Sequence, residues 1–139
     1  MQVSTEPPRH AGRPRSQRQL RVGEEIRHGL ADVLMRRELR DPDLPDPPPT
    51  ITEVRISPDL KNATVFFAPL GGAADDAARK TVAAALARAT PFLRRHLAAV
   101  TRLRQVPSLS FRYDDAFDTA GRISALIHRS RPAAMEDDG

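Results

Sequence analysis

The sequence predicts a single α+β domain, in which a helix, a β-hairpin, two helices separated by a kink and a third strand follow one another, with a short helix at the end. Three observations predict this class. The chain has 139 residues, enough for one modest hydrophobic core. Segments with helical apolar spacing alternate with short β-rich segments. Proline-rich or polar stretches separate these segments, and no internal repeat indicates a second domain.

The two ends of the chain differ from the rest in composition. Residues 1–17 lack an apolar period and are basic and proline-rich, and residues 131–139 end in an acidic cluster. Such segments cannot bury enough apolar surface to order themselves, so we expect two disordered tails. Residues 18–130 are then the folded domain.

The first helix is expected over residues 18–39, because Val22, Ile26 and Leu30 recur at helical spacing. Two glycines inside it each lower helix propensity by about 1 kcal/mol relative to alanine. Residues 41–49 (DPDLPDPPP) carry too many prolines for a helix or a central strand, and are expected to form a stiff, extended connector.

Residues 50–57 and 62–68 are rich in β-branched and aromatic residues and are separated by the short polar turn SPDLK. This pattern predicts an antiparallel hairpin. Strict alternation along the first strand places Thr52, Val54 and Ile56 on one face.

The longest apolar stripe of the sequence follows the hairpin. Asp75 and Asp76 suit the first turn of a helix, where acidic side chains meet the positive end of the helix dipole. The stripe continues at helical spacing through Val82, Leu86, Ala89, Leu93, Leu97 and Val100. Pro91 interrupts it, because proline lacks the N–H and restricts Thr90. We therefore expect two helices with a kink at Ala89, Thr90 and Pro91, where Thr90 is the N-cap. Because the stripe is continuous, Pro91→Ala is expected to straighten the pair.

The rest of the chain completes the order. Residues 105–108 are expected to end the second helix of the pair, and residues 109–113 alternate apolar and polar side chains as a strand does. Apolar spacing from Phe117 through Ala120 to Ile127 predicts the short last helix.

The charge pattern predicts a polyanion as the partner. The formal net charge is +4, and no Asp or Glu occurs between Asp76 and Asp114, a stretch that carries many arginines. A long segment of one sign favours nucleic acid, and arginine binds phosphate through two parallel hydrogen bonds.

Five arginines of this stretch are the candidate RNA-binding residues. Three recur at seven-residue spacing opposite the apolar stripe, one flanks them, and one extends the surface toward the third strand. They are Arg88, Arg94, Arg95, Arg102 and Arg104. The alternative is a solvated helix face whose arginines pair with acids elsewhere, such as Glu24, Glu25 or Asp32. The start of the second helix offers a further possibility, since the N–H groups of Phe92 and Leu93 could bind a phosphate, but the kink could equally be structural only.

Several classes of function are excluded or disfavoured. Without cysteine the chain has no disulfide, thiolate metal site or cysteine nucleophile. The histidines lack metal-ligand spacing, no catalytic motif is present, and the pair Asp114–Asp115 is better explained as a helix cap. We therefore expect no enzymatic activity, cofactor, metal or small-molecule substrate. The apolar run Val82 to Ala87 is too short to cross a bilayer, and no secretory signal is evident, so we expect a cytoplasmic protein.

Three segments resemble the ribosome-binding factor A family. They are RQLRVGEEIRHGLADVLMRRELRDP, the hairpin ITEVRISPDLKNATVFFAPLG, and ARATPFLRRHLAAVTRLRQVPSLSFRYDD, within a similarity that covers about residues 15–130. The resemblance implies a type II KH-like fold and a monomeric, non-catalytic factor, on which growth in the cold depends. Such a factor binds the maturing small (30S) ribosomal subunit and assists processing and late maturation of its 16S rRNA. A generic KH-like RNA-binding module and a protein–protein adaptor remain alternatives.

The resemblance also gives the kink a counterpart. The family has an Ala-x-Gly kink where ordinary KH domains carry a GxxG loop, and the corresponding residues are Ala89, Thr90 and Pro91. Proline in place of the family's glycine implies a kink made by helix breaking rather than by glycine flexibility.

Overall fold

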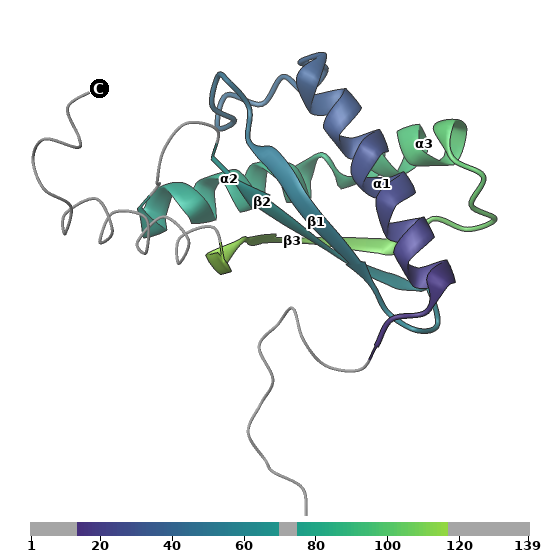
Figure 1. The fold of residues 1–139 in the computed structure, drawn as a ribbon. Coiled ribbons are helices and arrows are strands. Elements are labelled where there is room, and N and C mark those ends of the chain that lie inside the picture. The colour runs from purple at the N-terminus through teal and green to yellow at the C-terminus, as the bar shows by residue number, and fades with distance from the viewer. Residues whose placement is uncertain (1–13, 70–74, 117–139) are drawn as a thin grey trace, which may run out of the picture.

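The computed structural model describes residues 14–69 and 75–116, and in this part of the chain three helices pack on one face of a three-stranded sheet (Figure 1). In chain order the elements are α1 (Gln17–Met35), β1 (Thr50–Ile56), β2 (Asn62–Ala68), α2 (Asp76–Arg88), α3 (Thr90–Val100) and β3 (Ser108–Tyr113). This order confirms the predicted α+β class. The predicted last helix from Phe117 to Ile127 and the acidic tail lie outside the described residues.

Helix α1 begins with a capping box. The Ser16 hydroxyl accepts a hydrogen bond from the Gln19 N–H (3.0 Å), and the Gln19 side chain accepts one from the Ser16 N–H (2.9 Å). The Gln19 amide also donates to the Ile56 carbonyl (2.8 Å), which ties the start of α1 to the end of β1. The helix ends at Met35, earlier than the predicted residue 39, because Arg37 adopts a left-handed backbone conformation (φ 54°).

The hairpin is antiparallel as predicted, but β1 contains a bulge. The pairing shifts between Ile51 and Glu53, so Ile51 joins Val54 and Ile56 in the core and Thr52 does not. The prediction that Thr52 shares their face was therefore wrong. The Thr52 hydroxyl instead donates to a carboxylate oxygen of Asp114, at the end of β3.

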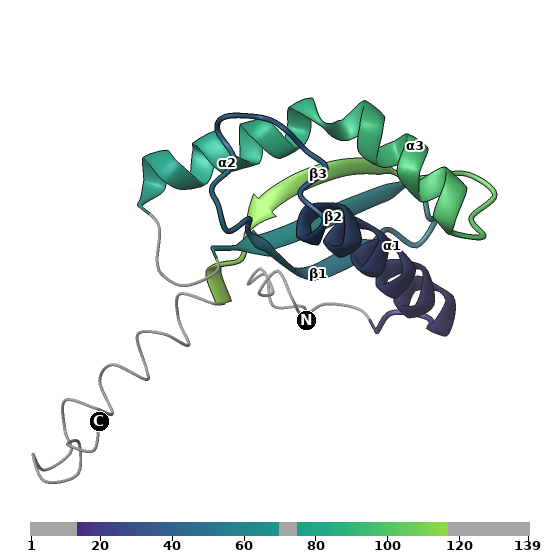
Figure 2. The same ribbon diagram turned by 90° about the horizontal axis from the view of Figure 1, so that it is seen from above.

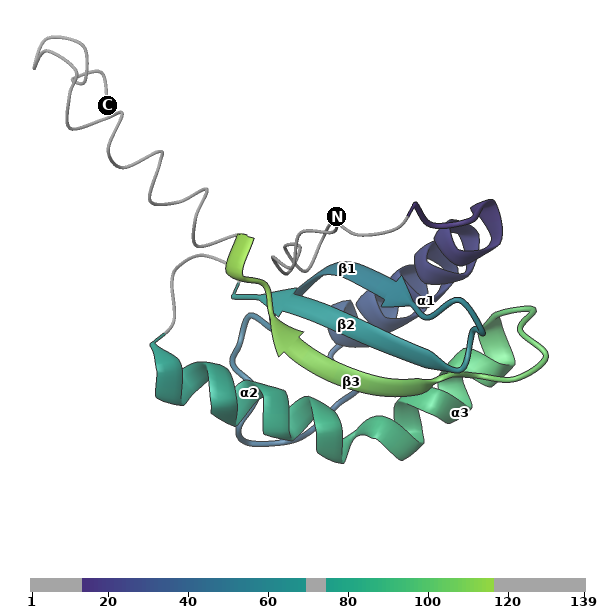
Figure 3. The ribbon, with the colours of Figure 1, turned by 90° about the horizontal axis from the view of Figure 1, so that it is seen from below.

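Strand β3 pairs with β2 in parallel, with Ser108 opposite Asn62 and Tyr113 opposite Phe67. A parallel pair needs a long crossover, which α2 and α3 supply. Viewed from below, the strands lie in front and all three helices lie behind them (Figure 3). Between helices and sheet lies one core, which includes Val22, Ile26, Leu30, Val33, Val54, Val65, Phe67, Leu86, Leu93 and Leu97.

Helices α2 and α3 form the predicted helix-kink-helix, which Figure 2 shows bending over the sheet. Asp75 caps α2 by accepting the Ala78 N–H (2.8 Å). Two details differ from prediction. Ala89, not Thr90, is the N-cap of α3, and it makes no side-chain cap bond. Helix α3 ends at Val100, well before residues 105–108, because Thr101 is extended. Arg102 therefore lies beyond the helix.

Candidate nucleic-acid interface

At the kink, one of the two predicted phosphate donors, the Leu93 N–H, is used inside the fold. The Ala89 N–H donates to the carbonyls of Ala85 (3.3 Å) and Leu86 (3.0 Å), and the Leu93 N–H donates to the Ala89 carbonyl (2.9 Å). The Leu93 donor is therefore occupied inside the helix. The structure favours a structural kink over a phosphate site at this position.

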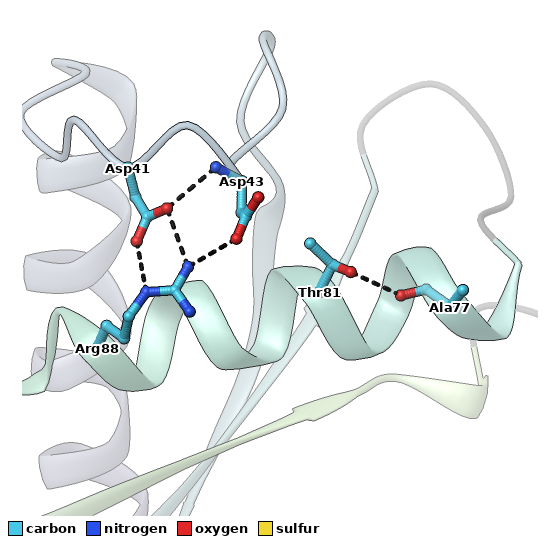
Figure 4. A network of polar contacts seen from close by, with 5 residues as sticks. All are labelled: Asp41, Asp43, Ala77, Thr81 and Arg88. Carbon is cyan, nitrogen blue, oxygen red and sulfur yellow. Dashed lines mark hydrogen bonds and ion pairs between the residues drawn. The ribbon is translucent and has the colours of Figure 1, made fainter.

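Arg88 at the end of α2 is bound to the connector (Figure 4). Its Nε donates to Asp41 (2.9 Å), and its Nη2 donates to both Asp41 (3.0 Å) and Asp43 (2.9 Å). These hydrogen bonds from the guanidinium hold the pKa of Asp41 below its ordinary value. The arginine is thus paired with acids, as the alternative interpretation held, but with connector acids rather than Glu24, Glu25 or Asp32.

Arg94 has a structural role within the fold. Its Nη2 donates to the Val106 carbonyl (2.6 Å) and its Nε donates to the Pro107 carbonyl (3.2 Å). Both acceptors belong to buried residues in the segment that leads into β3. The guanidinium therefore joins the start of α3 to the start of β3.

The remaining three candidates, Arg95, Arg102 and Arg104, are exposed. No ion pair joins them to any residue within 14–69 or 75–116. The Arg102 side chain is available although its backbone N–H donates to Glu25 (3.4 Å). Thus the structure separates the five predicted residues into two with internal partners and three that remain open to a ligand.

Sequence reasoning missed three basic residues that lie close to two of these candidates. Arg18 and Arg21 on α1 and Lys61 in the β1–β2 turn line the same groove as Arg102 and Arg104. All three are exposed. A partial signal was present, since Arg18 and Arg21 lie off the apolar stripe of α1. Nothing local in the sequence indicates that the hairpin turn meets them.

No group of three His, Asp or Glu side chains within residues 14–69 and 75–116 could hold a metal ion. None of the helices described is long and apolar enough to span a membrane.

The fold and the surface together define a KH-like domain with an exposed basic face. Comparison with known proteins gives the family: the family model described as "Ribosome-binding factor A" matches residues 18–127. Ribosome-binding factor A of Paramagnetospirillum magneticum is 53% identical over 116 residues, which cover 84% of this chain and 79% of that protein. This chain belongs to the ribosome-binding factor A family.

Solved structures agree with that assignment. The crystal structure of ribosome-binding factor A from Thermus thermophilus has a TM-score of 0.56 and 25% identity, and the similarity covers 68% of this chain and 93% of that one. A homology model of the Thermus thermophilus factor, fitted into a cryo-EM map of a 30S–RbfA complex, has a TM-score of 0.51 and 28% identity. The similarity covers 67% of this chain and 91% of that chain.

Proposed function

We propose that this protein is a ribosome assembly factor that binds the maturing small subunit in the cytoplasm and assists 16S rRNA processing and late maturation. Family membership carries the proposal, because a relative of the same fold has been fitted into a complex with the 30S subunit. The exposed arginines supply chemistry that suits rRNA as the partner.

The proposed mechanism is binding without catalysis. Arg95, Arg102 and Arg104 neutralise rRNA phosphates, and each contact releases condensed counterions. A protein that binds one arrangement of RNA helices more tightly than another shifts the population toward the first, and this requires no bond to be made or broken. Arg88 and Arg94 contribute indirectly, because their side chains hold the connector and the α3–β3 segment in place.

Co-sedimentation with free small subunits over a series of salt concentrations tests the proposal. An assembly factor should sediment with the free small subunit, and log affinity should fall with log salt at a slope on the order of −3 if three to four phosphates are contacted. A protein–protein adaptor would not follow the subunit. Binding with a flat salt response would point to a ribosomal protein rather than rRNA as the contact.

A further inference from the structure

The groove that holds Arg102 and Arg104 is built by three segments far apart in the sequence. The first turns of α1, the β1–β2 turn and the segment between α3 and β3 meet at one end of the molecule, as Figures 1 and 3 both show. Their side chains line an open groove with a volume of about 590 Å³. Its cations are Arg18, Arg21, Lys61, Arg102 and Arg104.

The acids of the groove form no ion pair with its four arginines, although Asp59 lies near enough to Lys61 to feel its charge. Two acidic residues line it, Glu25 and Asp59. Asp59 accepts hydrogen bonds from the Ser57 hydroxyl (2.6 Å) and the Lys61 N–H (3.0 Å), which together lower its pKa, so its carboxylate is engaged in the turn. Glu25 accepts the backbone N–H of Arg102. No guanidinium of the described residues pairs with either carboxylate.

This arrangement differs from that of most other arginines in the described part of the chain. Elsewhere guanidinium groups are paired with carboxylates, as in Arg15–Glu53, Arg27–Glu24, Arg36–Asp32, Arg37–Asp46 and Arg88–Asp41. A fold that pairs its arginines in this way, but gives four groove arginines no carboxylate partner among the described residues, keeps a positive potential in that hollow. Like charges so gathered repel one another, and a bound polyanion would relieve that repulsion.

We propose that this groove binds the sugar–phosphate backbone of small-subunit rRNA, with Arg18, Arg21 and Lys61 acting together with Arg102 and Arg104. The proposal rests on the proposed function and extends it to two elements that sequence reasoning did not include. An extended groove with cations contributed by three segments suits several consecutive phosphates better than one small anion. Apolar side chains that line the same groove, such as Leu60 and Leu103, offer contact surface for sugars.

The test compares two double variants that remove equal charge. Arg21→Gln with Arg104→Gln removes two groove cations. Arg40→Gln with Arg112→Gln removes two exposed cations that lie outside the groove and have no ion pair with the described residues. Binding of each is measured on free small subunits and on protein-free small-subunit rRNA, over a salt series, with circular dichroism to confirm the fold.

We expect the groove variant to weaken binding to both probes by tenfold or more and to make the salt slope shallower by about 1.4 to 1.8, since each of the two lost phosphate contacts contributes about 0.7 to 0.9. The slope of log affinity against log salt should be clearly steeper for the control variant than for the groove variant. If Arg21→Gln with Arg104→Gln loses its fold, Arg18→Gln with Lys61→Gln makes the same measurement on the other side of the groove.

The outcomes separate this proposal from the proposed function. Groove and control variants that bind both probes alike would overturn the groove. A groove variant that loses the subunit but keeps protein-free rRNA would also overturn it, because the groove would then contact a ribosomal protein. A wild-type protein that ignores subunits but binds rRNA through the groove would overturn the proposed function and leave the groove standing.

Discussion

An arginine can use its five N–H donors inside the protein or keep them for a partner, and the neighbouring residues Arg94 and Arg95 do one each. Arg94 donates to two backbone carbonyls of the segment before β3, whereas Arg95 is exposed and unpaired among the described residues. Helical geometry places consecutive residues about 100° apart, so only one of the two can face that segment. The sequence alone does not distinguish the roles of these two arginines, because the difference arises from what each side chain faces in the fold.

This difference predicts opposite effects for the two side chains. Arg94→Gln should lower the free energy of unfolding by about 1–2 kcal/mol, because the buried carbonyls of Val106 and Pro107 lose a charged donor. Arg95→Gln should leave stability unchanged and weaken RNA binding. Urea denaturation and subunit sedimentation of both variants check this. Equal stability of the two would show that the Arg94 hydrogen bonds contribute nothing net.

At the scale of elements, α1 approaches its neighbours so closely at two glycines that no Cβ fits there without a shift. A Cβ added at Gly23 would lie 2.7 Å from the Val54 carbonyl oxygen, and one at Gly29 would lie 2.7 Å from the end of the Leu97 side chain. From the sequence alone, each of these glycines only lowers the helix propensity of α1. The structure shows why α1 has them: they allow close packing on β1 and α3.

Gly23→Ala should therefore destabilise the protein although alanine is the better helix former. The gain in propensity is about 1 kcal/mol, whereas overpacking against an immobile backbone atom costs about 1–3 kcal/mol. Gly29→Ala is the matched comparison, and it should cost less because the terminal atom of Leu97 can move more easily than a strand backbone. Thermal unfolding of the two variants measures the difference. A more stable Gly23→Ala protein would contradict the close approach.

At the kink, the helical spacing of apolar residues and the packing of the core favour different geometries of the helix pair. The continuous stripe predicts that Pro91→Ala straightens the helix pair. Straightening would restore about one helical hydrogen bond, worth about 0.5–1.5 kcal/mol. It would also lift Leu93 and Leu97 from the core, where they are 2% and 0% exposed, and each buried leucine is worth about 1.5–3 kcal/mol. Packing is the larger effect, so we now expect the bend to persist.

Backbone chemical shifts of the Pro91→Ala variant decide between the two expectations. Shifts for residues 87–91 close to those of the wild type would indicate a retained bend, and subunit binding should then be unchanged. Pro91→Gly serves as the comparison, because it restores the same N–H without favouring the helix. Helical shifts throughout, together with weaker binding, would show that proline rather than packing sets the bend.

These cases show which features of the structure can be predicted from the sequence and which cannot. Periodicity predicted every element of the described residues, because burial of one face dictates a period of 3.6 or 2. It did not predict the bulge at Thr52 or the end of α3 at Val100, since both depend on backbone conformations that many sequences permit. Of the five groove cations, the sequence singled out only Arg102 and Arg104 as candidates. The other three cations come from the hairpin and α1, which only the tertiary fold brings to the same place.

At the scale of the whole molecule, the Arg88 clamp connects two parts of the chain that the sequence separates widely. Arg88 lies 47 residues from Asp41 and 45 from Asp43, and its side chain holds the connector against the end of α2. Two apolar residues, Leu39 just before the connector and Leu44 within it, pack against the core. The connector is therefore held by a charged contact and by the burial of apolar side chains. A change of pH can remove the first and leave the second in place.

The charged contact should be lost in acid and the apolar contact should not. Because Arg88 lowers the pKa of Asp41, stabilisation from this pair is fully present above the ordinary aspartate pKa of about 4 and is lost as the pH falls through the lowered value. Arginine stays charged throughout this range, so the group of this pair that titrates is the Asp41 carboxylate. Hydrogen-exchange protection of the amides over residues 39–46 should therefore be constant from pH 7 to about 5 and fall below about pH 4. The amides of β2, which packs in the core, should keep their hydrogen-exchange protection to lower pH than the connector amides do.

Arg88→Gln should produce the acid behaviour at neutral pH. Its connector should exchange faster at pH 7, with no further loss of protection on acidification until the protein as a whole unfolds. Arg36→Gln is the control, because Arg36 pairs with Asp32 (3.2 Å) and with Glu38 (3.9 Å), and neither pair reaches α2 or the connector acids Asp41 and Asp43. If Arg88→Gln leaves connector exchange unchanged, then Leu39 and Leu44 alone hold the segment. In that case Arg88 would be able to leave Asp41 and Asp43 and to bind an RNA phosphate at little cost.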